Sequence, residues 1–199
     1  MKIIGITGPT GAGKTTALNA LTSLGACVID ADAVYHRLLE ESLPMRDALT
    51  ARFGDIGDGA GGIDRKKLGN VVFTDPAALA ELNVITHRFV EEAIDQLLTG
   101  AEESGCPAAA IDAIALIESG LGEQCDAVVG VIAPAEVRIR RIMAREGISE
   151  EYARKRVSAQ KGEDFFRAHC DYVLENTEDD TPETFGERAL VLFTEILDH

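Results

Sequence analysis

The sequence predicts an α/β fold in which helices cover both faces of a five-stranded parallel sheet. The chain opens with an apolar run that leads through a glycine-rich loop into helix-forming residues. Its later apolar runs show almost no alternation, which is typical of strands buried on both faces. Helical spacing of apolar residues separates these runs, and no internal repeat is present. Strands interleaved with helices in this way form a doubly wound, three-layer sheet.

The first loop carries the clearest chemical signal. A strand is predicted over residues 3–7 and an amphipathic helix over 15–24, and the loop between them fits the pattern G-x-x-x-x-G-K-[ST]. A polyphosphate needs several backbone N–H groups turned inward at once, and glycines allow that curl. The strand–loop–helix context favours a phosphate-binding loop over an unliganded turn. We expect the nucleotide phosphates to be bound by Gly11, Ala12, Gly13, Lys14, Thr15 and Thr16, with Lys14 at the β- and γ-phosphates and the Thr15 hydroxyl on Mg²⁺.

Two carboxylates lie at the end of the second predicted strand, residues 26–30: one ends the strand and the other follows two positions later. Because functional side chains in such sheets gather at the carboxyl ends of strands, Asp30 and Asp32 should lie near the phosphate loop. The alternative for Asp32 is a purely structural role as the N-cap of the next helix.

Residues 44–100 are predicted to form a helical insertion beside the sheet, the natural place for a second substrate. Helices are expected over 44–53, 63–73 and 76–98, and residues 53–62 form a flexible loop. His87 lies within the longest helix, where an isolated histidine is more often a structural or surface residue than a ligand.

Strands are also predicted over 108–112 and 127–132. Asp112 ends the first of these strands, where it either holds a magnesium-bound water or is an ordinary surface residue. Glu118 follows on a loop. A fifth strand, residues 171–176, ends in Asn176, and residues 181–197 form a closing helix.

Basic residues gather between the fourth and fifth strands. Residues 138–169 are predicted to be helical apart from a break at 146–149. Such a segment opposite the phosphate loop resembles a mobile lid that closes over a transferring phosphoryl group, and the alternative is a solvated helix face balanced by glutamates. The core is then 1–43, 101–137 and 170–199. The basic residues are Arg138, Arg140, Arg141, Arg145, Arg154, Lys155, Arg156, Lys161 and Arg167.

Composition excludes several classes of partner. With 34 acidic and 19 basic residues, the net charge of −15 argues against binding to nucleic acid or to an anionic membrane. We expect a cytoplasmic protein, since no signal peptide or membrane span is apparent. The four cysteines lack CxxC spacing, so reduced thiols are expected at Cys27, Cys106, Cys125 and Cys170.

Several stretches together resemble the dephospho-coenzyme A kinases over nearly the whole chain. The similar blocks are residues 4–16, 24–25, 28–32, 64–65, 68–69, 72–73, His87, 118–121, Arg145 with Gly147 and Ser149, 159–160 and 171–176. The Ile-Asp-Ala-Asp element that ends at Asp32 is far more specific than the phosphate loop alone.

The resemblance implies transfer of the γ-phosphoryl group of ATP to the ribose 3′-hydroxyl of dephospho-coenzyme A, with Mg²⁺. We expect a monomer or weak homo-oligomer. Asp32 matches the proposed catalytic base and Arg145 the lid arginine, and Lys14 completes the catalytic set. Arg141 and Asn176 would bind the nucleotide. The implied acceptor contacts are Asp32, Arg65, His87 and Glu118.

Three alternatives stay open at this point. The same fold also serves kinases of other small acceptors, such as nucleoside monophosphates. Residues 58–61 and 176–179 loosely imitate GTPase patterns, although no lysine follows Asn176. A nucleotide-binding scaffold without catalysis is the third alternative.

Overall fold

A computed structural model describes residues 1–199, which divide into two compact units. The first unit comprises Met1–Ile29 and Gly100–His199, and the second comprises Asp30–Thr99. The second unit therefore takes in residues 30–43 as well as the stretch predicted as the helical insertion.

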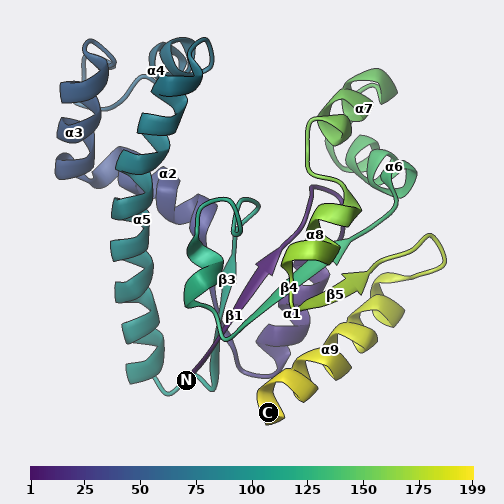
Figure 1. The fold of residues 1–199 in the computed structure, drawn as a ribbon. Coiled ribbons are helices and arrows are strands. Elements are labelled where there is room, and N and C mark those ends of the chain that lie inside the picture. Colours follow the sequence, from purple (N-terminus) through teal and green to yellow (C-terminus); the bar gives the residue numbers. More distant parts are fainter. The chain divides into compact units, whose positions relative to one another are not determined.

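The sheet has five strands in the order β2-β3-β1-β4-β5 (Figure 1). Pairing is parallel between β1 and β3, between β1 and β4, and between β4 and β5. The predicted five-stranded parallel sheet is thus confirmed. Since the chain places neighbours on both sides of β1, the carboxyl end of β1 lies at a topological switch point, where ligands bind in such sheets. The strands are β1 (Lys2–Thr7), β2 (Cys27–Asp30), β3 (Ala108–Asp112), β4 (Ala127–Ile132) and β5 (Tyr172–Glu175).

Helices cover both faces of this sheet. Helices α1 (Lys14–Ser23) and α9 (Pro182–Asp198) pack together on one face, where Leu21, Phe185 and Phe193 are fully buried against alternate residues of β1, β3 and β4. Helix α8 (Glu163–His169) lies on the other face, with Phe166 close to the backbone of Gly130 in β4. A short 3₁₀ helix, η1 (Leu121–Gln124), precedes β4.

The predicted lid segment begins as a helical pair with its own small core. Helices α6 (Ala135–Glu146) and α7 (Glu150–Ser158) bury Ile142 and Ala153 between them. Ser149 caps α7 by accepting a hydrogen bond from the Tyr152 amide at 3.3 Å, as its position predicts. The prediction of a single break was wrong, because the chain leaves helical geometry again at residues 159–162 before α8 begins.

The second unit is helical. It contains α2 (Ala31–Glu41), α3 (Leu43–Phe53), α4 (Arg65–Val72) and most of α5 (Pro76–Glu103), which share a core that includes Met45, Leu49 and Leu68. Residues 54–62 form a loop, as predicted, but the loop packs against the helices of this unit. Ile56 is fully buried in this core, and the Asp58 carboxylate accepts the amides of Ala60 and Gly62 at 2.8 Å each.

The structure contains no helix whose length and apolar character would let it cross a membrane.

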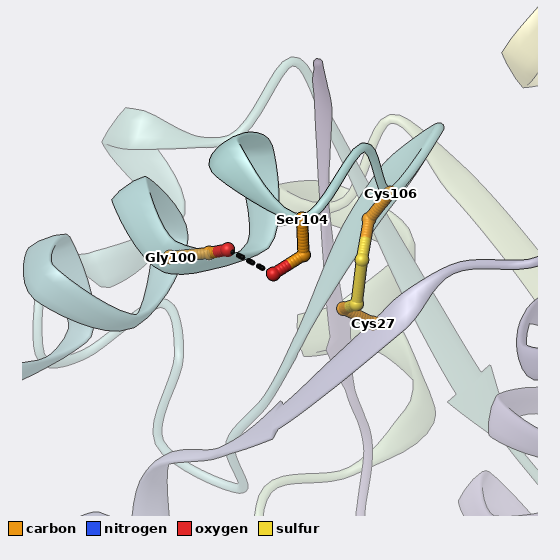
Figure 2. Close-up of a disulfide and its surroundings, with 4 residues drawn as sticks. All are labelled: Cys27, Gly100, Ser104 and Cys106. Atoms are coloured by element: carbon orange, nitrogen blue, oxygen red, sulfur yellow. Dashed lines mark hydrogen bonds between the residues drawn. A yellow bond between two sulfur atoms is a disulfide. The ribbon is translucent and has the colours of Figure 1, made fainter.

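The prediction of four reduced cysteines was wrong for one pair. Cys27 and Cys106 form a disulfide, and Figure 2 shows it beside the turn in which the Ser104 hydroxyl donates to the Gly100 carbonyl at 2.7 Å. Cys27 begins β2 and Cys106 precedes β3, so adjacency of these strands brings together sulfurs that lie 79 residues apart in sequence. Cys125 and Cys170 remain free, and burial raises the pKa of Cys125 to about 12 and that of Cys170 to about 11.

We expect reduction of the disulfide to lower the free energy of unfolding by about 2–4 kcal/mol, because a link across so long a loop restricts the unfolded chain. Urea denaturation with and without dithiothreitol measures this change. The double variant Cys27→Ser/Cys106→Ser is the control and should show no response to the reductant. An unchanged midpoint in the wild-type protein would contradict the prediction.

Candidate active site

The phosphate loop joins β1 to α1 through three glycines in the left-handed region of φ. Gly8, Gly11 and Gly13 have φ of 144°, 84° and 109°. A Cβ on Gly8 would lie 2.1 Å from the Val131 carbonyl oxygen, and one on Gly13 would lie 2.3 Å from Asn176 Nδ2. The loop therefore needs glycine both for its curvature and for its close approach to β4 and the end of β5.

Helix α1 presents an open amino terminus. It begins at Lys14, its N-cap is Gly13 without a side-chain cap, and its first turn has no acidic residue. The first amides of a helix lack partners within the helix and carry the positive end of its dipole. This terminus is therefore suited to an anion.

A cavity of about 310 Å³ opens at this point. The structure brings the predicted residues Gly11, Gly13, Lys14 and Thr15 together with the predicted arginines in one site. The cavity is lined by Pro9, Thr10, Gly11, Gly13, Lys14, Thr15, Ile114, Arg141 and Arg145. Arg145 is exposed and its Nη2 pairs with Glu146 Oε1 at 2.6 Å, a contact that uses only one nitrogen of the guanidinium.

Asp112 lies beside the phosphate-loop lysine. Lys14 Nζ is 3.9 Å from Asp112 Oδ1 and donates to the Gly8 carbonyl at 3.3 Å. Because β3 pairs with β1, the residue that ends β3 lies next to the phosphate loop. Asp112 is therefore not an ordinary surface residue, which was one of the two possibilities left open by the sequence. The Asp112 carboxylate and the Thr15 hydroxyl are hard oxygen donors of the kind that Mg²⁺ prefers. No group of three or more metal-binding side chains occurs, so the ion would also need phosphate oxygens or water.

A second cavity of about 260 Å³ flanks the loop and is lined by Gly13, Thr16, Arg141, Asn176, Asp180 and Pro182. Asn176 is buried; its Nδ2 donates to the Ala12 carbonyl at 2.9 Å and its Oδ1 accepts from Arg141 Nη2 at 2.9 Å. Burial lowers the pKa of Arg141, and its guanidinium forms the wall shared by the two cavities.

The remaining arginines of residues 138–169 divide into two groups. Arg154 bonds to Glu136 at 2.7 and 2.9 Å, and Arg156 pairs with Glu146. These exposed pairs fit the solvated-face alternative, and such pairs contribute about 0–1 kcal/mol each. Arg138, in contrast, is buried and donates to the Thr10 carbonyl at 2.9 Å. Sequence reasoning did not separate Arg138 from the exposed arginines, although its helical spacing with Ile142 on the buried face of α6 is a usable signal.

Three predicted site residues lie in the second unit. Asp30, not Asp32, is the N-cap of α2, because its Oδ1 accepts the Ala33 amide at 2.8 Å. The capping alternative for Asp32 was therefore wrong, and Asp32 is exposed in the first turn. Arg65 Nη2 pairs with Glu40 at 2.9 Å, and His87 is half-buried in α5. The roles of Asp32, Arg65 and His87 stay predictions.

Glu118, in the first unit, is exposed beside a third cavity of about 220 Å³. This cavity adjoins the phosphate loop through Pro9 and the predicted lid through Gln160, Lys161 and Phe166.

The sequence model of the dephospho-CoA kinase family (CoaE) matches residues 2–181. The chain belongs to this family. A dephospho-CoA kinase of Thermobifida fusca is 34% identical over 194 residues, which cover 97% of this chain and 95% of that protein.

Two solved structures are similar to this chain. The protein TT1252 from Thermus thermophilus has a TM-score of 0.81 at 34% identity and matches 98% of this chain and 97% of its own. Dephospho-CoA kinase from Campylobacter jejuni has a TM-score of 0.71 at 26% identity and matches 100% and 98% of the two chains.

We expect Gly13→Ala to abolish measurable ATP binding, because the new Cβ would meet Asn176 Nδ2 at 2.3 Å in a conformation with φ of 109°. Isothermal titration with ATP and Mg²⁺ measures the affinity. Gly100→Ala is the matched control: it adds the same methyl group inside α5, with nothing within 4 Å, and should leave binding intact. ATP affinity in Gly13→Ala within twofold of wild type would contradict the packing argument.

Proposed function

We propose that this protein transfers the γ-phosphoryl group of ATP to the ribose 3′-hydroxyl of dephospho-coenzyme A, forming coenzyme A and ADP in the last step of coenzyme A biosynthesis. The observation that carries the proposal is the convergence of Lys14, Asp112, Arg141 and Arg145 on a phosphate loop in a member of this family. Such a set suits phosphoryl transfer, which depends on positioning and charge stabilisation more than on covalent chemistry.

ATP would extend across the two cavities beside the loop. Its phosphates would lie in the 310 Å³ cavity against Gly11–Thr16, and its adenine in the 260 Å³ cavity against Arg141 and Asn176. The open amino terminus of α1 and the Lys14 ammonium would bind the phosphates.

The transfer step requires cations around the γ-phosphoryl group and a correctly aimed alcohol. Lys14 and Arg145 would stabilise the charge on its oxygens as the bond to ADP breaks. Asp32 would orient the acceptor 3′-hydroxyl and accept its proton as the new P–O bond forms. Thr15 and Asp112 would hold Mg²⁺, which neutralises phosphate charge when bound.

The acceptor would be bound by Arg65, His87 and Glu118, with residues 44–100 as its binding segment and residues 138–169 as the lid that excludes water. We further propose that the enzyme acts in the cytoplasm, where ATP is available, as a monomer or weak homo-oligomer.

With ATP and Mg²⁺, we expect dephospho-coenzyme A to release ADP faster than any nucleoside monophosphate in a panel of acceptors. A coupled assay that detects ADP measures this directly. Lys14→Ala supplies the background and should show no turnover, because the β- and γ-phosphates lose their cation. A nucleoside monophosphate that outpaced dephospho-coenzyme A would replace the proposed acceptor.

Asp32→Asn should lower kcat by roughly 10²–10⁴-fold with ATP affinity unchanged, because an amide keeps the shape of the side chain but accepts no proton. Asp30→Asn is a matched control two positions away. Asparagine caps helices as well as aspartate does, so this variant should stay within a few-fold of wild type. Steady-state kinetics compare the two. Near-normal turnover by Asp32→Asn would remove Asp32 from the role of base.

A further inference from the structure

Three consecutive carbonyls of the phosphate loop accept hydrogen bonds from side chains. The Thr10 carbonyl accepts from Arg138 Nε at 2.9 Å, the Gly11 carbonyl from Arg141 Nη1 at 3.3 Å, and the Ala12 carbonyl from Asn176 Nδ2 at 2.9 Å. Arg141 and Asn176 also line the nucleotide cavities, whereas Arg138 lines none of the cavities described above.

Gln160 completes the contacts around Thr10. Its Oε1 accepts the Thr10 amide at 3.2 Å and Arg138 Nη2 at 2.5 Å, and its Nε2 donates to Thr10 Oγ1 at 3.0 Å. Gln160 therefore bonds to the amide and the hydroxyl of Thr10, and Arg138 bonds to its carbonyl. Gln160 lies in the second break of the predicted lid, between α7 and α8, where no helix geometry constrains it.

The burial of Arg138 is explained by these contacts. Only 4% of its surface is exposed, and burial lowers its pKa despite the favourable charge of Glu163. A buried guanidinium is costly unless it is well hydrogen-bonded. The exposed Arg154, in contrast, bonds only to the carboxylates of Glu136 and Glu150.

The orientation of loop carbonyls determines the orientation of loop amides. In a trans peptide the C=O and N–H bonds point in opposite directions. Bonds to the Thr10 and Ala12 carbonyls therefore direct the N–H groups of Gly11 and Gly13 to the other side of the loop. Glycines would otherwise sample several peptide orientations, and an anion site is strongest when its donors are aligned before the ligand arrives.

We propose that Arg138 and Gln160 are positioning residues that hold the phosphate loop at Thr10 in its phosphate-binding conformation. They act through the loop backbone and contact no phosphate. The inference rests on the proposed function only in taking a nucleoside triphosphate as the donor.

Gln160→Ala provides the main test, since Gln160 is only half-buried and its loss should leave the fold intact. We expect affinity for ATP to fall about tenfold, as loss of buried hydrogen bonds does, and affinity for AMP to stay within about twofold, because AMP lacks the β- and γ-phosphates. Calorimetry with Mg²⁺ and each nucleotide measures both constants, and circular dichroism confirms folding. Equal weakening of ATP and AMP, or a lower melting temperature with unchanged ATP affinity, would overturn the proposal.

Four further variants separate the backbone contacts from other effects. Gln160→Glu should keep the ATP affinity that Gln160→Ala loses, because a carboxylate accepts hydrogen bonds from the Thr10 amide and from Arg138. Thr10→Val replaces the hydroxyl with a methyl group and keeps the backbone contacts with Arg138 and Gln160, so it should weaken ATP binding less than Gln160→Ala does. Arg138→Lys keeps the charge but cannot reach both Thr10 and Gln160, so it should reproduce Gln160→Ala. Arg154→Ala, the control within the same segment, should bind ATP normally. A defect in Thr10→Val as large as that of Gln160→Ala would assign the effect to the hydroxyl and overturn the backbone mechanism.

This binding test is independent of the acceptor. If ATP and AMP respond as described but dephospho-coenzyme A is not phosphorylated, the proposed function fails while the inference about the loop stands.

Discussion

The close approach of the loop after β1 to its neighbours is the constraint on which the site depends. A side chain at Gly8 would strike the backbone of β4, and one at Gly13 would strike Asn176 at the end of β5. Only glycine permits both contacts together with the left-handed curvature of the loop. The amino terminus of α1 is then aligned with the cavity, and an anion can reach amides that have no partner within the helix.

The order of the strands brings the remaining parts of the first unit to this loop. Because β1 lies between β3 and β4, the residue that ends β3, Asp112, reaches Lys14, and the chain that leaves β4 enters α6 beside the loop. Helix α6 supplies Arg138 and Arg141, and Asn176 follows directly after β5. Residues from distant parts of the sequence thus bond to three consecutive carbonyls at the switch point of the sheet.

Charge in this acidic protein is arranged locally around the site. The net charge is −15, yet the cavity beside the loop is lined by Lys14, Arg141 and Arg145. Most other arginines of residues 138–169 are matched by glutamates at the surface, where such pairs add little stability. Lys14 and Arg145 also lie close to the carboxylates of Asp112 and Glu146. The three cations nevertheless gather at the loop, where they can attract an anionic ligand that the rest of the surface would repel.

The sequence by itself determined the features that depend on neighbouring residues. It predicted the strands, the phosphate loop and the Ser149 cap, since each follows from spacing along a few residues, and the ordered blocks from residue 4 to 176 indicated the family. Only the tertiary structure decided the Cys27–Cys106 disulfide, the contact of Asp112 with Lys14, and the separation of Arg138 from Arg154. The first two depend on which strands are adjacent, which local spacing does not encode. Helical spacing with Ile142 points to the buried side of α6 for Arg138, but only the tertiary structure shows that it bonds to Thr10 and Gln160. The identity of the N-cap, Asp30 and not Asp32, also depends on the residue at which β2 ends and α2 begins.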